Sequence, residues 1–330
     1  MCHCPRWIVT LEASRHTCLV GRRVTSVAGA PATVPHMAAH AGITTGRATA
    51  NGIDFTFLEC GTGPLALCLH GFPDSAHSWR HLLPALAAAG FRAVAPFTRG
   101  YAPTSTAADG YYATGTLAAD ANALHEVLGG SDDAVIIGHD WGAPSAYGAA
   151  GRRPDLWRRV VGMAVPPGPA FSLAFMTNQT QLKRSWYMFF FQHALADLVV
   201  PANDLAFIDM LWADWSPGFA GSEDIDNVKR CLRDPENLSA ALGYYRATLG
   251  DAKKDPAVDE EQRLCFEAPP QPTLYLHGVK DGCCGKEVAE SAKAMCPDVT
   301  VQFVSDAGHF LQVEQPEIVN QLVVDWVTTR

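Results

Sequence analysis

An aspartate between two glycines forms the most distinctive motif in the chain. The motif, Gly138–Gly142, reads Gly-His-Asp-Trp-Gly and directly follows the apolar stretch Ala134–Ile137, which is typical of a buried strand. Glycines two positions either side of Asp140 permit a sharp strand-to-helix turn that exposes the central side chain above a sheet. A carboxylate there can attack an electrophilic carbon and leave an alkyl ester on the enzyme. The motif predicts a nucleophilic aspartate for epoxides or carbon–halogen bonds, although alone it also fits a surface turn.

Hydrolysis of such an ester requires a general base and an acid that orients the base. Asp281 follows the apolar stretch Thr273–Leu276, and His309 follows Val299–Val304, so the three residues occur in the order nucleophile, acid, histidine. An isolated histidine is usually structural, but position and order together favour His309 as the base and Asp281 as its partner. Asp306 is the competing acid, yet at three residues before the histidine it is expected to cap a turn.

A fourth element is the sequence His70-Gly71-Phe72-Pro73, which follows the apolar stretch Leu65–Leu69. Here the backbone N–H groups of Phe72 and Trp141 are predicted to form an oxyanion hole for hydrolysis of the ester. The alternative is an ordinary Gly-Pro turn.

Short apolar strands alternate with helical patterns along the chain, which predicts a mostly parallel sheet covered by helices on both faces. A helix is expected over Ser75–Ala89, although Pro84 lies inside it, and another is expected to be capped by Thr116. The final helix should begin at Pro316, with Ile318, Leu322 and Trp326 on one side. The predicted strands are Ile53–Leu58, Leu65–Leu69, Phe91–Ala95, Ala134–Ile137, Val160–Ala164, Thr273–Leu276 and Val299–Val304.

Residues 167–268 interrupt this alternation with an aromatic-rich, helical pattern between two strands. We interpret this segment as a helical cap, with prolines at 166–169 and 269–272 as its hinges. The core is then formed by residues 37–166 together with 269–330. Residues 1–36 show no regular period and no apolar core of a signal peptide, so we expect a disordered extension, with Met37 as a plausible true start.

Composition narrows the classes of partner. The formal charge is −9 without a dense Lys/Arg run, which disfavours nucleic acid and anionic membranes and suits a small neutral substrate. No stretch approaches the roughly 20 apolar residues of a membrane-spanning helix. Ten cysteines fit neither a disulfide framework nor a zinc pattern, which favours reduced thiols and a cytoplasmic protein. No cluster suggests a metal or an organic cofactor, and a homodimer is left open.

Taken together, these motifs resemble the epoxide hydrolases of the α/β-hydrolase fold, which are close to the haloalkane dehalogenases. The resemblance spans roughly residues 42–328 and includes Val279-Lys280-Asp281 and Gly308-His309-Phe310 followed by Glu314-Gln315-Pro316. It implies an α/β-hydrolase fold, with a mostly parallel sheet flanked by helices and a helical cap inserted after the sixth strand. It also implies a cis bond between Phe72 and Pro73.

Two tyrosines in the predicted cap would distinguish an enzyme for epoxides from one for halides. The segments Trp186–Gln192 and Gly243–Arg246 are similar to those that carry the paired tyrosines of epoxide hydrolases, which places the pair at Tyr187 and Tyr245. Opening an epoxide produces an alkoxide, so a phenol with a pKa of about 10 must share or give its proton, whereas a halide needs none. The alternatives are a core aromatic for Tyr187 and a surface position for Tyr245.

One departure from the family pattern lies after the fourth strand, where Phe97 stands in place of the usual aspartate. The function implied is hydrolysis of an epoxide by water to a vicinal diol, through an ester on Asp140 that His309 and Asp281 help to cleave. A haloalkane or haloacid dehalogenase with the same nucleophile and a non-catalytic ligand receptor are the alternatives.

Overall fold

The structure is a computed structural model that describes residues 42–329. The expectations about residues 1–36 and Met37 lie outside the described residues.

The seven cysteines among the described residues all have free, buried thiols. No helix of this region is long and apolar enough to cross a membrane. The predicted cytoplasmic location and the homodimer stay predictions.

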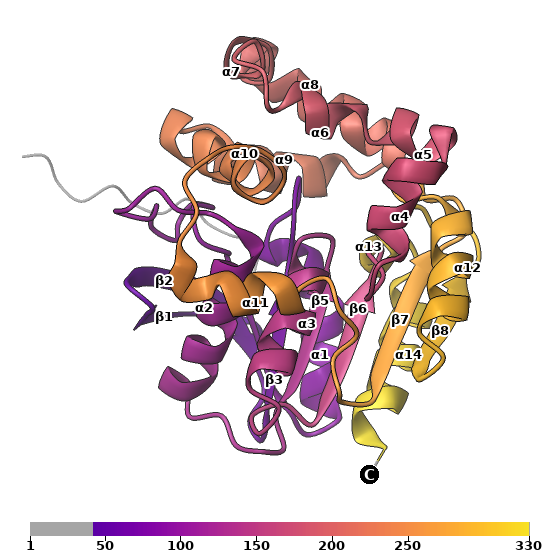
Figure 1. Ribbon diagram of the computed structural model, residues 1–330. Helices are drawn as coiled ribbons and strands as arrows, with labels where there is room; N and C mark the ends of the chain where they lie inside the picture. The colour runs from indigo at the N-terminus through magenta and orange to yellow at the C-terminus, as the bar shows by residue number, and fades with distance from the viewer. Residues whose placement is uncertain (1–41, 330) are drawn as a thin grey trace, which may run out of the picture. The chain divides into compact units, whose positions relative to one another are not determined.

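A single sheet of eight strands organises the described residues (Figure 1). The strand order is β1-β2-β4-β3-β5-β6-β7-β8, with antiparallel pairing of β1 to β2 and of β2 to β4 and parallel pairing elsewhere. The predicted mostly parallel sheet is therefore confirmed. The strands are β1 (Thr44–Ala50), β2 (Ile53–Cys60), β3 (Leu65–Leu69), β4 (Arg92–Pro96), β5 (Val135–His139), β6 (Arg159–Met163), β7 (Thr273–Gly278) and β8 (Val299–Val304).

Strand β1 was not predicted. Its sequence, Thr-Thr-Gly-Arg-Ala-Thr-Ala, has no apolar alternation, and most of its side chains are exposed. It forms because it lies at the sheet edge and pairs with β2 along its whole length through backbone hydrogen bonds.

Side chains of alternating strand residues enter two separate cores. Leu65, Leu67 and Leu69 of β3 pack toward helices α2 (Thr114–Val127) and α3 (Gly142–Arg152). The intervening residues of β3 pack in the other core, with α1 (Leu82–Ala88) and α14 (Pro316–Thr328). The sheet is therefore covered by helices on both faces, as its apolar strands predict.

Three helix predictions need correction. The expected helix over Ser75–Ala89 is a 3-10 helix, η1 (Ala76–Arg80), followed by α1, and Pro84 lies in the first turn of α1 where a missing N–H costs little. Thr116 does not cap a helix, because α2 begins two residues earlier at Thr114. In α14, Leu322 and Trp326 of the predicted side are partly buried against the core, whereas Ile318 is 47% exposed, and the fully buried row is Val319, Val323 and Val327.

The segment between β6 and β7 is helical, and Figure 1 shows helices α5–α10 beyond the end of the sheet toward which β7 runs. Its helices are α4 (Ala170–Thr177), α5 (Gln179–Arg184), α6 (Trp186–Phe190), α7 (Ala196–Val199), α8 (Ala202–Trp215), α9 (Ser222–Leu232), α10 (Pro235–Leu249), η2 (Pro256–Val258) and α11 (Asp259–Leu264). Of these, α11 contacts α2 and α3. The remaining helices are α12 (Lys286–Met295) and α13 (Leu311–Glu314). The division into core and cap stays a prediction.

Candidate active site

Asp140 lies in a sharp turn between β5 and α3. It has a positive φ of 51°, in the left-handed region that L-residues rarely adopt, and the turn is closed by a hydrogen bond from the Ala143 N–H to the Asp140 carbonyl, 2.9 Å. A Cβ on Gly138 would overlap the Gly142 carbonyl, and one on Gly142 would overlap the Leu69 carbonyl. The flanking glycines are thus needed for close backbone packing, and the left-handed residue is the aspartate itself.

Both carboxylate oxygens of Asp140 face a defined partner. Oδ1 accepts a hydrogen bond of 2.7 Å from the backbone N–H of Phe72, and Oδ2 lies 3.4 Å from Nε2 of His309. Gly71 has no room for a side chain, because a Cβ there would overlap Oδ1 of Asp140 and the backbone N of Trp141. The Phe72–Pro73 peptide bond is cis, as the resemblance implies. The loop after β3 is therefore shaped around the carboxylate of Asp140.

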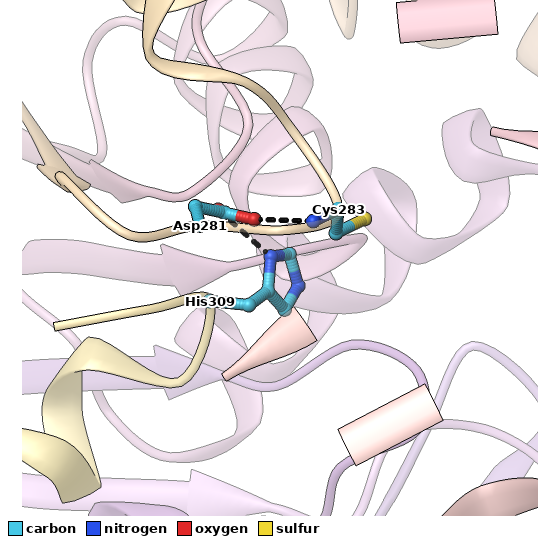
Figure 2. A group of neighbouring side chains, drawn as sticks. All are labelled: Asp281, Cys283 and His309. Carbon is cyan, nitrogen blue, oxygen red and sulfur yellow. Dashed lines mark hydrogen bonds and ion pairs between the residues drawn. The ribbon is translucent and has the colours of Figure 1, made fainter. Parts of the chain in front are cut away.

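Asp281 and His309 follow β7 and β8 and are in direct contact. Nδ1 of His309 lies 3.0 Å from Oδ2 of Asp281, and both side chains are buried. Oδ1 of Asp281 accepts the backbone N–H groups of Cys283 at 2.7 Å and Cys284 at 2.9 Å. Figure 2 shows the Asp281 carboxylate between the backbone of Cys283 and the His309 ring. The acid is held at both oxygens, and it orients the imidazole toward Asp140.

Neighbouring charges set the pKa values of His309 and Asp281. Burial acts to lower the pKa of His309, but the charges and hydrogen bonds of Asp281 and Asp140 outweigh it and raise the pKa to about 10. For Asp281, burial acts to raise the pKa, but the neighbouring His309 holds it below its usual range. At neutral pH the free site therefore holds a protonated His309 between Asp281 and Asp140.

Asp306, the competing acid, is turned away from this pair. Its side chain is exposed and forms an ion pair of 2.7 Å with Lys280. It lies in a turn with a positive φ of 59°, but its carboxylate bonds Lys280 instead of capping the turn.

Asp281, Cys283 and His309 also form a set that could hold a metal ion, since one ligand atom from each lies within 4.8 Å of the others. In the described arrangement both oxygens of Asp281 already accept hydrogen bonds, and burial raises the pKa of the Cys283 thiol well above its usual value. A metal there would have to displace these hydrogen bonds and a thiol proton.

A cavity of about 300 Å³ opens next to Asp140. Among the described residues that line it, Asp140 is the one that carries a charge, and most others are aromatic or aliphatic. Tyr187 from α6 and Tyr245 from α10 both line it, with ring centroids 5.7 Å apart. The cavity therefore combines one carboxylate and two phenols in apolar surroundings.

The two phenols differ in their contacts. The Tyr187 hydroxyl lies 3.3 Å from Sγ of Cys283, whereas the Tyr245 hydroxyl makes no hydrogen bond of normal geometry with the described residues. Burial raises the pKa of both tyrosines well above 10. Both hydroxyls are therefore protonated at neutral pH, and that of Tyr245 is free to donate.

Sequence reasoning missed several groups around the site. His139, inside the nucleophile motif, lies 3.3 Å from Oδ2 of Asp74 through Nδ1, and its Nε2 lies 2.9 Å from the His309 carbonyl. The Cys283 and Cys284 N–H groups that hold Asp281 were also missed. Their position two and three residues after an aspartate is typical of an Asx turn, which could have identified them.

Phe97 replaces the aspartate of the family pattern, and the loop that follows it is held by a hydrogen bond to His70 and by an ion pair of Arg99. Phe97 is buried, and the next backbone N–H, that of Thr98, donates to Nε2 of His70 over 3.0 Å. Arg99 forms a buried ion pair with Asp120, which fixes the loop to α2.

The fold and the site have counterparts among known proteins. The AB hydrolase superfamily protein YfhM of Bacillus subtilis is 28% identical over 284 residues, which cover 84% of this chain and 95% of the relative. Epoxide hydrolase B of Mycobacterium tuberculosis is 27% identical, with 80% of this chain and 91% of the relative covered. The crystal structure of a Bacillus megaterium epoxide hydrolase in complex with an inhibitor matches with a TM-score of 0.73 at 25% identity, covering 86% of this chain and all of that one. The family model described as alpha/beta hydrolase fold matches residues 64–316, so the chain belongs to the α/β-hydrolase family and is similar to its epoxide hydrolases.

Proposed function

We propose that this protein is an epoxide hydrolase that forms vicinal diols through an alkyl ester on Asp140. The observation that carries the proposal is the arrangement of Asp140, with one oxygen held by the Phe72 N–H and the other facing His309, on the wall of a cavity that two buried phenols share. The epoxide hydrolases among the relatives support the same reaction class.

In the first step, a carboxylate oxygen of Asp140 attacks a ring carbon, and the carbon–oxygen bond of the epoxide breaks. The electron pair stays on the ring oxygen, which takes a proton from Tyr245 or Tyr187. Formation of the ester removes the negative charge of Asp140, and with it one of the interactions that raise the pKa of His309. The imidazolium can then return a proton to the phenolate and become a base.

In the second step, neutral His309 takes a proton from water, and the hydroxide attacks the carbonyl carbon of the Asp140 ester. The N–H groups of Phe72 and Trp141 would stabilise the resulting oxyanion. Collapse of this intermediate breaks the ester bond, and its hydroxyl proton passes to the departing alkoxide, which releases the diol and restores the carboxylate while Asp281 stabilises the imidazolium. The predicted roles of Phe72, Trp141, Tyr187, Tyr245, Asp281 and His309 are all included in this scheme.

A His309→Gln variant tests the scheme, because it can form the ester but lacks the base that removes it. We expect incubation with an epoxide such as styrene oxide to add the mass of the substrate to the peptide that contains Asp140. The matched control is the double variant Asp140→Asn, His309→Gln, which should gain no mass. Turnover by the unmodified protein without any adduct in His309→Gln, or with the adduct on another residue, contradicts the proposal.

Dehalogenation is a second candidate, favoured by one observation. Trp141 lines the same cavity, and its buried Nε1 makes no hydrogen bond of normal geometry within the described part of the chain, although its side chain interacts with Tyr245, so this N–H is a candidate donor to a halide. Halide release from a bromoalkane, measured beside diol formation from an epoxide of equal size, separates the two activities. We expect diol formation to be the faster reaction because two phenols face the cavity.

A further inference from the structure

The end of helix α8 touches the loops that carry the acid and the base. The carbonyl oxygen of Trp215 accepts two backbone hydrogen bonds, from Gly282 at 3.0 Å and from His309 at 3.1 Å. Gly282 immediately follows Asp281. One carbonyl from the segment between β6 and β7 therefore connects the two loops whose side chains form the Asp281–His309 contact.

Two glycines allow this approach. We call residues Asp214–Ser216 the α8 corner. A Cβ on Gly282 would overlap the Asp214 carbonyl, and a Cβ on Gly308 would lie 2.6 Å from Cα of Ser216 and 2.8 Å from the Trp215 carbonyl oxygen. Since these neighbours are mainly backbone atoms, they cannot move aside as a flexible side chain could. The α8 corner is packed directly against the residue after the acid and the residue before the base.

The hydroxyl of Ser216 completes the connection. It accepts the backbone N–H groups of His309 at 3.0 Å and Phe310 at 3.3 Å, and it donates to Oε1 of Glu314 over 2.6 Å. Oε2 of Glu314 accepts the N–H of Gly308 over 2.7 Å. A hydroxyl offers one proton and two lone pairs, so all three are used here. Ser216 is also 1% exposed, which leaves no access for water to replace it.

We propose that Ser216, held by Glu314, is a positioning residue that keeps His309 in place for hydrolysis of the Asp140 ester. This inference rests on the proposed function and extends it, because it makes the base dependent on the α8 corner. Besides its contact with His309, Asp140 is held by its own turn and by the Phe72 N–H, neither of which involves Ser216. Loss of the Ser216 hydroxyl should therefore slow ester hydrolysis and leave ester formation unchanged.

The test compares the rates of the two steps in single turnovers, with the adduct on Asp140 quantified by mass spectrometry after rapid quenching. In Ser216→Ala the buried Phe310 N–H loses its acceptor, and we expect ester hydrolysis to slow about tenfold with ester formation within about twofold of the unmodified protein. Ser216→Thr keeps the hydroxyl and should restore most of the hydrolysis rate. The matched control is Thr248→Val in α10. It removes another hydroxyl of the region between β6 and β7, one that bonds Thr114 of α2 at 2.9 Å, and it should change neither step.

A second measurement does not require turnover. The proton on Nδ1 of His309, bonded to Asp281, should give a low-field proton NMR signal whose exchange with water is several-fold faster in Ser216→Ala than in Thr248→Val. If Ser216→Ala does not fold, Glu314→Gln takes its place, since the amide has one acceptor oxygen for the two donors, the Ser216 hydroxyl and the Gly308 N–H, that the carboxylate accepts.

The outcomes separate this inference from the proposed function. Slower hydrolysis with more adduct in Ser216→Ala, together with rescue by threonine, supports the inference. An unchanged ratio of the two rates, or an equal loss in both, overturns it while the proposed function stands. Absence of any adduct in His309→Gln contradicts the proposed function, and the NMR signal then decides the positioning role alone.

Discussion

The backbone N–H of Phe72 donates a hydrogen bond of 2.7 Å to Oδ1 of Asp140. The same N–H is the predicted oxyanion donor, so in the proposed mechanism one donor would serve the carboxylate before the reaction and the tetrahedral oxygen during ester hydrolysis. A donor fixed in the backbone needs no reorganisation between the two states, which is the arrangement that stabilises developing charge best.

Gly71→Ala tests this donor. The added methyl group would overlap Oδ1 of Asp140 and the Trp141 backbone, so we expect kcat/KM to fall by roughly a hundredfold, the effect of losing one oxyanion donor. The matched control is Gly151→Ala in α3, where the new Cβ would lie 3.4 Å from Leu264, an ordinary contact. Steady-state kinetics on one epoxide would measure both variants. A Gly71→Ala protein as active as Gly151→Ala would contradict the role of the Phe72 loop.

Asp140→Asn should lower the pKa of His309. The carboxylate of Asp140 contributes to the elevated pKa of about 10, and an amide removes that charge while burial still acts to lower the pKa. NMR titration of the histidine ring protons in both proteins would measure the difference. An unchanged pKa would contradict the view that ester formation converts His309 into a base.

Stability should depend on pH through the same group. The folded pKa of His309 is about 10 and its usual value is 6.5, so its stabilising contribution is complete below 6.5 and is lost as the pH rises toward 10. Over that window the free energy of unfolding should fall by up to about 1.4 kcal/mol per pH unit relative to His309→Gln. Asp281 acts oppositely: its pKa is lowered, so its contribution is lost as the pH falls below 3.8. Urea unfolding at several pH values would measure the difference, and parallel curves for the two proteins would contradict it.

The two cavity tyrosines should not be equivalent. The Tyr245 hydroxyl makes no hydrogen bond of normal geometry with the described residues, whereas the Tyr187 hydroxyl is already paired with the Cys283 thiol, so we expect Tyr245→Phe to slow ester formation by about a hundredfold and Tyr187→Phe by less. Tyr244→Phe is the matched control, because that hydroxyl donates to the Arg99 carbonyl instead of facing the reaction. Pre-steady-state measurement of ester formation would rank the three variants. A larger loss in Tyr187→Phe would reverse the assignment.

The cavity thiols should react slowly with alkylating reagents. Burial raises the pKa of both Cys283 and Cys284 well above 9, and the thiolate is the reactive form. Treatment with iodoacetamide at pH 8, followed by peptide mass spectrometry, should modify them far more slowly than free cysteine. Rapid modification of Cys283 would show that its surroundings stabilise the thiolate.

Much of the fold was predictable because strand and helix signals are local. Seven strands were placed from short apolar runs, and two of them, Leu65–Leu69 and Val299–Val304, have the predicted bounds. The inward side of α14 was predicted only in part, because two neighbouring rows of that helix are both apolar, and periodicity alone does not say which row is the more deeply buried.

The candidate site, like the fold, was only partly predictable from local sequence. The turn at Asp140 and the order of Asp140, Asp281 and His309 could be read from local sequence, and the structure brings these three side chains together. The groups that hold these side chains could not be predicted from local sequence, because Trp215 and Ser216 reach the His309 loop from a distant helix. Such pairings are set by tertiary packing and leave no periodic signal in the chain.

The pairing of β6 with β7 has a consequence for folding. These strands end at Met163 and begin at Thr273, so every residue between them must be synthesised before the centre of the sheet can extend toward β8. Contacts so distant in sequence carry a large loop-closure cost and slow the search for the native topology. In the proposed mechanism, a nascent chain released before β8 would lack His309, the base that regenerates Asp140, so completion of the polypeptide would be a condition for a second catalytic cycle.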